Sequence, residues 1–195
     1  MTVDLFSDED GNTPLSHEEK TGLIPSWIAL RHELNEVEQA NILEGERWAF
    51  SRGRDVLDES VLRALHKRMF GRVWSWAGEY SREKNRRIGS DSVMIPLDLR
   101  QLLGDTHYWV EKGTYSPDEI AVRFHHRLVL IHPFPNGNGR HGRLAADLLI
   151  TRLGAPRFTW SASPIDPGEA RNRYIAAQRA ADAHDIEPLL VFARS

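Results

Sequence analysis

A proline- and glycine-rich break, PFPNGNG at residues 133–139, separates two segments that both have the periodicity of helices. The segment before the break begins with Ser116, Pro117 and Glu119, the pattern of a capped helix start. Its apolar residues recur every three or four positions, at Ile120, Phe124, Leu128 and Ile131. The segment after the break, expected to be helical from about Gly139 to Gly154, has Leu144, Leu148 and Leu149 inside. The pattern therefore predicts two consecutive helices joined by a tight loop.

The rest of the chain also favours helices, and the predicted fold class is all-α with one small β-hairpin. Pro25 and Ser26 are expected to open a first long helix over residues 25–50. Further helices are predicted within residues 55–78, 96–113 and 166–193. Residues 80–95 have turn chemistry and poor helical periodicity, which predicts a hairpin or an irregular flap. We therefore expect a polar surface arm over residues 1–24 and one domain over residues 25–195.

Composition excludes several classes of function. The 195 residues contain no cysteine, so disulfides, thiolate metal sites and cysteine nucleophiles are ruled out. The formal net charge of −3 argues against a general nucleic-acid coat, and no nucleic-acid partner is expected. The acidic N-terminus does not look like a secretory signal, and no stretch approaches the roughly 20 apolar residues of a membrane span. The expected location is the cytoplasm, without a membrane partner.

The loop itself has the residues of an anion site. Gly137, Asn138 and Gly139 can turn successive N–H groups into one concavity at the start of a helix, where phosphates bind. Arg140 and Arg143 are three positions apart and can hold the same polyanion. His132, at the other lip, is placed to act as a general base, worth typically about 10²–10⁴-fold in rate. This chemistry points to phosphoryl or nucleotidyl transfer, although an ordinary turn with solvated arginines would have the same residue types.

Residues 132–143, HPFPNGNGRHGR, resemble the Fic-family signature H-P-F-x-[D/E]-G-N-G-R-x-x-R. The similarity extends over about residues 27–182, and the subgroup called mobile mystery protein B looks nearest. The resemblance implies an α-helical Fic fold and transfer of AMP from ATP to a hydroxyl of a target protein. It makes His132 the base that deprotonates a Ser, Thr or Tyr hydroxyl. It also makes the flap at residues 80–95 the element that presents the target.

The resemblance assigns the other loop residues as well. Gly137, Asn138 and Gly139 would form the anion hole, and Arg140 and Arg143 would hold the distal phosphates. Asn136 departs from the signature, because the acidic residue usual there holds the Mg²⁺ that bridges the phosphates. A neutral amide oxygen is a weaker ligand for this cation. Metal binding at Asn136 is therefore doubtful, and transfer from another phosphate-containing donor, or a binding-only regulatory module, remains open.

A regulatory switch is a further hypothesis. Residues 40–45, ANILEG, resemble the inhibitory sequence [S/T]-x-x-x-E-[G/N] of many Fic proteins, with Ala40 in the first position. Glu44 is then expected to pair with Arg143 and block productive ATP binding. The competing interpretation is that Glu44 is exposed at the edge of its helix face or pairs with another arginine.

Two other predictions concern metals and partners. His125, His126, His132 and His141 raise the question of a zinc or hydrolytic metal centre, but neighbouring residues on a helix point about 100° apart. The resemblance to the mobile mystery group suggests a helix-turn-helix or antitoxin-like partner, and a homodimer is left open.

Overall fold

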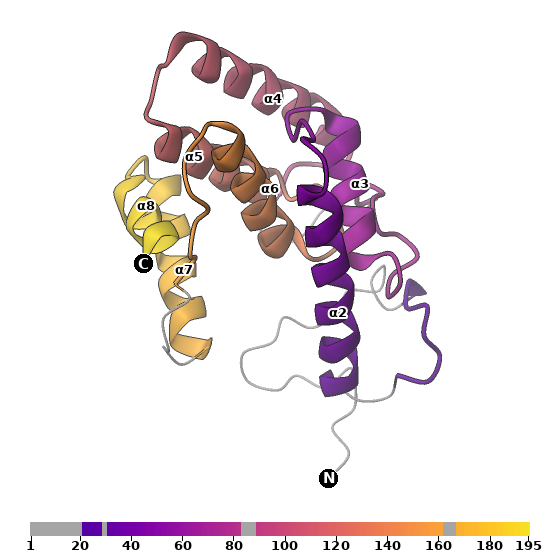
Figure 1. The fold of residues 1–195 in the computed structure, drawn as a ribbon. Coiled ribbons are helices and arrows are strands. Elements are labelled where there is room, and N and C mark those ends of the chain that lie inside the picture. The colour runs from indigo at the N-terminus through magenta and orange to yellow at the C-terminus, as the bar shows by residue number, and fades with distance from the viewer. Residues whose placement is uncertain (1–20, 29–30, 83–88, 162–166) are drawn as a thin grey trace.

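The computed structural model describes residues 21–28, 31–82, 89–161 and 167–195 (Figure 1). These residues form a helical fold and contain no β-strand, which confirms the predicted fold class. Its helices, in chain order, are α2 (Arg31–Phe50), α3 (Glu59–Phe70), α4 (Ile95–Lys112), α5 (Pro117–Ile131), α6 (Asn138–Arg152), α7 (Pro167–Asp182) and α8 (Glu187–Arg194).

The helix pair α5–α6 lies at the centre of the fold, with α2 and α3 on one side and α7 and α8 on the other (Figure 1). The predicted apolar positions of both helices are buried: Ile120, Phe124, Leu128, Ile131, Leu144, Leu148 and Leu149. The Ser116 side chain accepts a hydrogen bond from the Glu119 N–H at 3.2 Å, so the predicted cap of α5 is confirmed. Burial on several sides fixes these two helices, and they in turn fix the loop between them.

The prediction that Pro25 and Ser26 open the first long helix is wrong. Residues 25–28 form turns, and α2 begins at Arg31. Just before them, the chain is extended and paired: the Ile24 N–H donates to the Val73 carbonyl, and the Ser75 N–H donates to the Gly22 carbonyl, both at 2.8 Å. The predicted arm is therefore packed against the fold at its end, while its residues 1–20 lie outside the described part of the chain.

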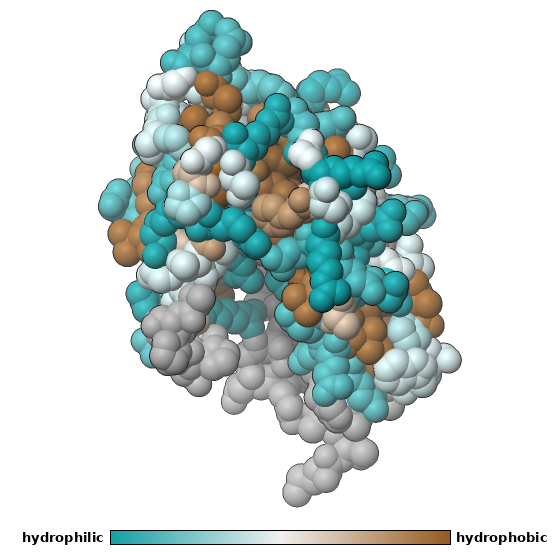
Figure 2. All heavy atoms as spheres, in the orientation of Figure 1, coloured by the Kyte–Doolittle hydropathy of each residue, from teal (hydrophilic) through white to brown (hydrophobic). Residues whose placement is uncertain are grey.

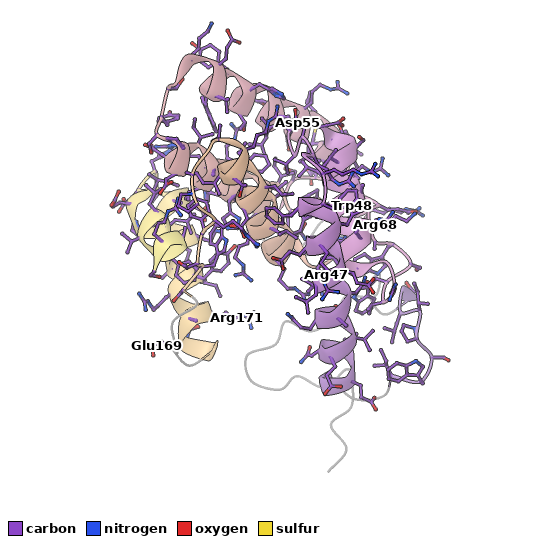
Figure 3. The ribbon with its side chains drawn as sticks, in the orientation of Figure 1. Arg47, Trp48, Asp55, Arg68, Glu169 and Arg171 are labelled. Carbon is purple, nitrogen blue, oxygen red and sulfur yellow. The ribbon has the colours of Figure 1, made fainter. Side chains whose placement is uncertain are left out.

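Helix α2 packs closely on α3 because its contact face has small and polar residues. A Cβ added at Gly45 would lie 2.7 Å from Met69 Cγ, so only glycine allows this approach. The buried amide of Asn41 donates to the Arg68 carbonyl at 2.9 Å and accepts from the Arg72 N–H at 3.0 Å. Trp48 and Arg68 lie at the same junction, with the Arg68 guanidinium 5.6 Å from a Trp48 ring centroid (Figure 3). The position of α2 is thus set by specific contacts.

On the face drawn in Figure 2, apolar side chains form small patches separated by polar ones. Within the described ranges, no helix combines the length and apolar character that crossing a membrane requires.

Candidate active site

His132 ends α5 in an unusual backbone conformation. Its φ of 54° and ψ of 56° are left-handed, a region that non-glycine residues enter rarely and at a cost. The imidazole Nδ1 lies 3.3 Å from the Val129 carbonyl oxygen. Because a carbonyl can only accept, Nδ1 carries the proton and Nε2 keeps a lone pair. Burial lowers the pKa of His132, while the bond to Val129 opposes that shift. The side chain is therefore a neutral imidazole with a basic Nε2.

Asn138 holds the loop closed. Its side-chain oxygen accepts the Phe134 N–H at 3.0 Å, and its Nδ2 donates to the Phe134 carbonyl at 2.7 Å. Gly137, with φ of 79°, is the N-cap residue of α6. The first N–H groups of a helix have no acceptor within the helix. Gly137, Asn138 and Gly139 thus lie at the start of α6, and the Asn138 side chain shapes the loop there.

His66 on α3 binds and packs against the loop, a role that the sequence did not predict. Its Nδ1 accepts the Gly78 N–H at 3.0 Å, so its Nε2 carries the proton and donates to the Asn136 carbonyl, also at 3.0 Å. Its ring stacks on Phe134 with 3.8 Å between centroids. Burial holds the pKa of His66 well below its usual range, which keeps the ring neutral. The buried ring of Phe134 thus anchors the loop to α3.

Both ends of the predicted flap are attached beside His132. The Ser81 N–H donates to the Pro133 carbonyl at 2.9 Å, and the Ser90 N–H donates to the Ile131 carbonyl at 3.0 Å. These two carbonyls flank His132 in the chain. Residues 80–82 and 89–95 contain no strand, whereas residues 83–88 of the predicted hairpin lie outside the described ranges. The attachment makes the ends of this segment neighbours of the candidate base.

A cavity of about 200 Å³ lies beyond the Ser90 attachment, lined by Ser90, Asp98, Gln101, Arg127, Leu130 and Ile131. Arg127 is paired with Asp105 at 2.6 Å. The cavity is thus lined by Ile131, the residue before His132 in the chain, and by residues from the flap end and from α4.

The two arginines of the loop have different surroundings. The Arg140 guanidinium pairs with Glu38 at 2.7 Å. Arg143 is partly buried, and among the described residues no carboxylate lies within ion-pair distance of it. Instead, its guanidinium lies 5.3 Å from the centroid of the Tyr174 ring. The site therefore contains one cation balanced by an acid and one that is not.

Glu38 is the acidic residue of α2 that reaches the site, and sequence reasoning missed it. It is only 6% exposed, and its second oxygen accepts a hydrogen bond from the Trp74 indole Nε1 at 2.7 Å. The buried face of α2 includes Leu34, Glu38, Asn41, Gly45 and Ala49. From the sequence alone, a charged residue at one of these positions would be assigned to the protein surface. No sequence signal therefore pointed to Glu38.

The predicted pair between Glu44 and Arg143 is not formed. Glu44 instead pairs with Arg72 at 2.8 Å, and 44% of its side chain is exposed. The reason is the orientation of α2, which buries Asn41 and Gly45 against α3 and leaves Glu44 at the edge of that face. The competing interpretation, an exposed edge position paired with another arginine, is the one the structure shows.

Asn136 does not suit a Mg²⁺ ion. Its side-chain oxygen accepts the Gly137 N–H at 2.5 Å. Mg²⁺ in nucleotide sites is typically held by carboxylates and phosphates. A neutral oxygen that already accepts a backbone hydrogen bond fits this requirement poorly, so no step proposed below depends on the cation.

The other histidines have structural partners. His141 Nε2 donates to the Leu62 carbonyl at 3.0 Å, and His126 Nε2 lies 2.8 Å from an Asp182 carboxylate oxygen. His125 Nε2 lies 3.1 Å from the Tyr174 hydroxyl. Over the described ranges, no three His, Cys, Asp or Glu side chains are grouped so that they could hold a metal ion.

The sequence of this region also matches a known protein family. Residues 56–150, which include α3, the flap ends, α5 and the loop, match the Fic/DOC family model. The chain belongs to the Fic/DOC family.

Known Fic proteins resemble the chain in sequence and in fold. The protein adenylyltransferase Fic of Drosophila yakuba is 32% identical over 141 residues, 71% of this chain and 27% of that protein. The chain thus spans about a quarter of the length of such curated relatives, 27% here. The N-terminal Fic domain of a Bep effector from Bartonella quintana superposes with a TM-score of 0.71 at 18% identity, covering 92% of both chains. BepC from Bartonella tribocorum, solved with AMPPNP, has a TM-score of 0.69 at 17% identity and covers 92% of this chain and 97% of its own.

Proposed function

We propose that this Fic domain transfers AMP from ATP to a hydroxyl side chain of a target protein. The observation that carries the proposal is His132, a neutral imidazole whose Nδ1 is engaged by Val129 and whose Nε2 has no partner among the described residues. It lies beside the start of α6, whose first N–H groups have no acceptor within the helix, and beside Arg143, which has no carboxylate within ion-pair distance among the described residues. The adenylyltransferase activity named for the Drosophila relatives supports this assignment.

The proposed step is a single displacement at the α-phosphorus. The hydroxyl oxygen of the target attacks phosphorus, and the bond from phosphorus to the β-phosphate oxygen breaks. His132 Nε2 takes the hydroxyl proton, and pyrophosphate leaves. The first N–H groups of α6 stabilise the negative charge on the phosphate oxygens, since such donors are already oriented before the reaction.

The remaining residues orient the donor and acceptor. Arg143, with Arg140 once Glu38 releases it, would hold the β- and γ-phosphates. The target segment would approach between the flap ends at Ser81 and Ser90, because these residues adjoin His132. Asn138 and His66 would keep the loop in one conformation while the phosphates bind.

The test is incubation of the purified protein with ATP labelled at the α- or the γ-phosphate, followed by intact mass and label counting on the protein. We expect auto-modification by the α-label and none by the γ-label. Arg143→Ala should lower the labelling, whereas Arg123→Ala, which removes another tyrosine-stacked arginine, should leave it unchanged. Incorporation of the γ-label would contradict AMP transfer. Nucleotide binding without any labelling would favour the binding-only role.

A further inference from the structure

Among the described residues, no carboxylate forms an ion pair with Arg143. Burial lowers the pKa of its guanidinium, which means that the charge is desolvated as well as unpaired. A buried cation normally has a carboxylate partner. Arg140, one turn away, has such a partner in Glu38. The Asp147 carboxylate attracts Arg143 only from beyond ion-pair distance, so the direct support of the guanidinium must be another kind of contact.

Tyr174 on α7 provides the support. Its ring lies under the Arg143 guanidinium at 5.3 Å, a distance at which the face of an aromatic ring attracts a cation. A Cβ added at Gly139 would lie 3.7 Å from the Tyr174 hydroxyl oxygen. The tyrosine therefore lies against the first turn of α6, where phosphates are expected.

The tyrosine is itself held in one orientation. Gln178 Nε2 donates to the Tyr174 hydroxyl at 2.9 Å, and that hydroxyl can donate to His125 Nε2 at 3.1 Å. Burial lowers the pKa of His125 to about 3, so its ring is neutral and Nε2 can accept. Gln178 Nε2 also lies 3.0 Å from the same nitrogen. This triangle ties α7 to α5 and fixes the ring under Arg143.

We propose that Tyr174 is a positioning residue, which holds Arg143 for the phosphate chain of the nucleotide without forming an ion pair with it. An acid in the same place would orient the guanidinium but would neutralise it and compete with phosphate. The neutral ring orients it without that competition. The inference rests on the proposed function only in that the ligand is a nucleoside triphosphate.

The test compares wild type with Tyr174→Phe and Tyr174→Leu. We would measure Kd for ATP and for inorganic tripolyphosphate by calorimetry, and KM and kcat for auto-modification. Tyr174→Leu should weaken both ligands by about 3- to 30-fold, as expected for loss of a partly buried cation–π contact. Tyr174→Phe keeps the ring and should stay within about threefold of wild type. The loss should appear in KM, with kcat little changed.

Two controls separate positioning from folding. Tyr115→Leu removes a tyrosine from under Arg123, 4.5 Å away, far along the chain from the loop, and should not change either Kd. Thermal unfolding of each variant reports its stability. If Tyr174→Leu fails to fold, Tyr174→Met replaces it, since it also removes the aromatic face under Arg143 but fills the space with a flexible apolar side chain, and should weaken both ligands in the same direction.

The outcomes distinguish this inference from the proposed function. Weaker ATP binding with unchanged tripolyphosphate binding would mean that Tyr174 contacts the base, and would overturn the inference. Additive effects of Tyr174→Leu and Arg143→Lys would overturn it too, because a residue that acts through Arg143 cannot matter once Arg143 is altered. If folded Tyr174→Leu binds both ligands like wild type, the inference alone fails. If wild type binds neither, the proposed function fails.

Discussion

At the scale of single residues, the site depends on how each charge is compensated. Arg140 and Arg143 have the same chemistry and are one helical turn apart. Glu38 neutralises the first, and Tyr174 supports the second without neutralising it. A triphosphate therefore meets one cation that is available at once and another that is already occupied by a carboxylate.

Replacing Glu38 should make the Arg140 guanidinium available to the nucleotide phosphates. In Glu38→Gln, the negative charge beside Arg140 is lost, while the amide oxygen can still accept the hydrogen bond from the Trp74 indole Nε1. We expect ATP to bind about 2- to 5-fold more tightly, the size of effect given by one ion pair whose arginine is partly exposed. Calorimetric titration with ATP measures this.

Glu44→Gln is the matched control for that experiment. It removes a carboxylate from the same helix, but one that is paired with Arg72. The affinity for ATP should not change. Tighter ATP binding by Glu44→Gln, with an unchanged affinity in Glu38→Gln, would show that the wrong carboxylate has been assigned to the site.

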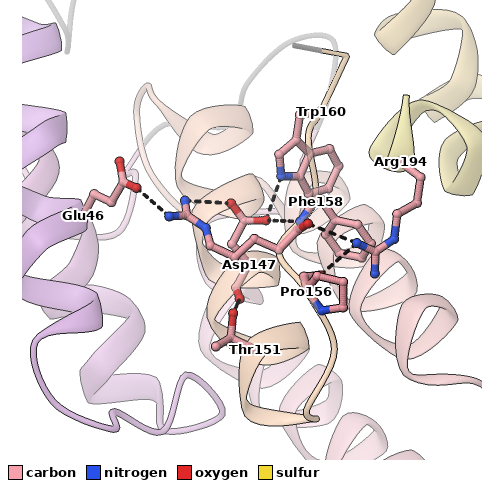
Figure 4. A network of polar contacts seen from close by, with 8 residues as sticks. Glu46, Asp147, Thr151, Pro156, Phe158, Trp160 and Arg194 are labelled. Carbon is pink, nitrogen blue, oxygen red and sulfur yellow. Dashed lines mark hydrogen bonds and ion pairs between the residues drawn. The ribbon is translucent and has the colours of Figure 1, made fainter. Parts of the chain in front are cut away.

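At the scale of elements, α6 connects the site to the rest of the fold. Its first turn forms the proposed anion-binding end, and its middle carries Asp147, which is 4% exposed. The Asp147 carboxylate accepts hydrogen bonds from Trp160 Nε1 at 2.9 Å and from the Phe158 N–H at 3.3 Å (Figure 4). Arg157 joins Asp147 to Glu46 of α2. One buried acid thus holds the segment after α6 and, through Arg157, helix α2.

Removing this acid should destabilise the protein. In Asp147→Ala, the buried Trp160 and Phe158 donors lose their acceptor, so we expect the free energy of unfolding in urea to fall by about 2–4 kcal/mol. Asp105→Ala is the control, because it breaks a more exposed pair with Arg127 and should cost no more than about 1 kcal/mol. Equal losses in both variants would contradict the role given to the network.

At the scale of the whole molecule, buried neutral histidines couple stability to pH. Burial lowers the pKa of His125 to about 3 and that of His141 to about 4. In the unfolded chain both titrate near 6.5. Below that pH the unfolded chain takes up protons that the folded protein does not, so stability present above pH 6.5 is lost as the pH falls.

Urea unfolding at pH 7 and pH 5 measures this loss. We expect each of the two histidines to reduce the free energy of unfolding by about 2 kcal/mol over that interval. His141→Gln should make the pH dependence shallower, and His184→Asn, at an exposed position, should not. A free energy of unfolding that is the same at both values would contradict the buried neutral state.

The sequence predicted the structural features that depend on residues close together in the chain. Helical spacing identified α3 to α6, and the Ser116–Glu119 pattern identified the start of α5. It did not identify Glu38 or His66, whose partners Arg140 and Asn136 are 102 and 70 positions away. Periodicity also defines the direction of a helix face but not its edges, so it left open whether Glu44 faces Arg143 or lies exposed at the edge of α2.

The central claim is that His132 Nε2 takes the proton of the acceptor hydroxyl. The most direct test measures, in parallel samples, Kd for ATP and the rate of AMP transfer for wild type and His132→Ala, with His184→Asn as the control. We predict that Kd in His132→Ala stays within about threefold, since Arg143 and the α6 N–H groups remain, while the transfer rate falls about 10²–10⁴-fold. Transfer by His132→Ala at the wild-type rate would contradict the account.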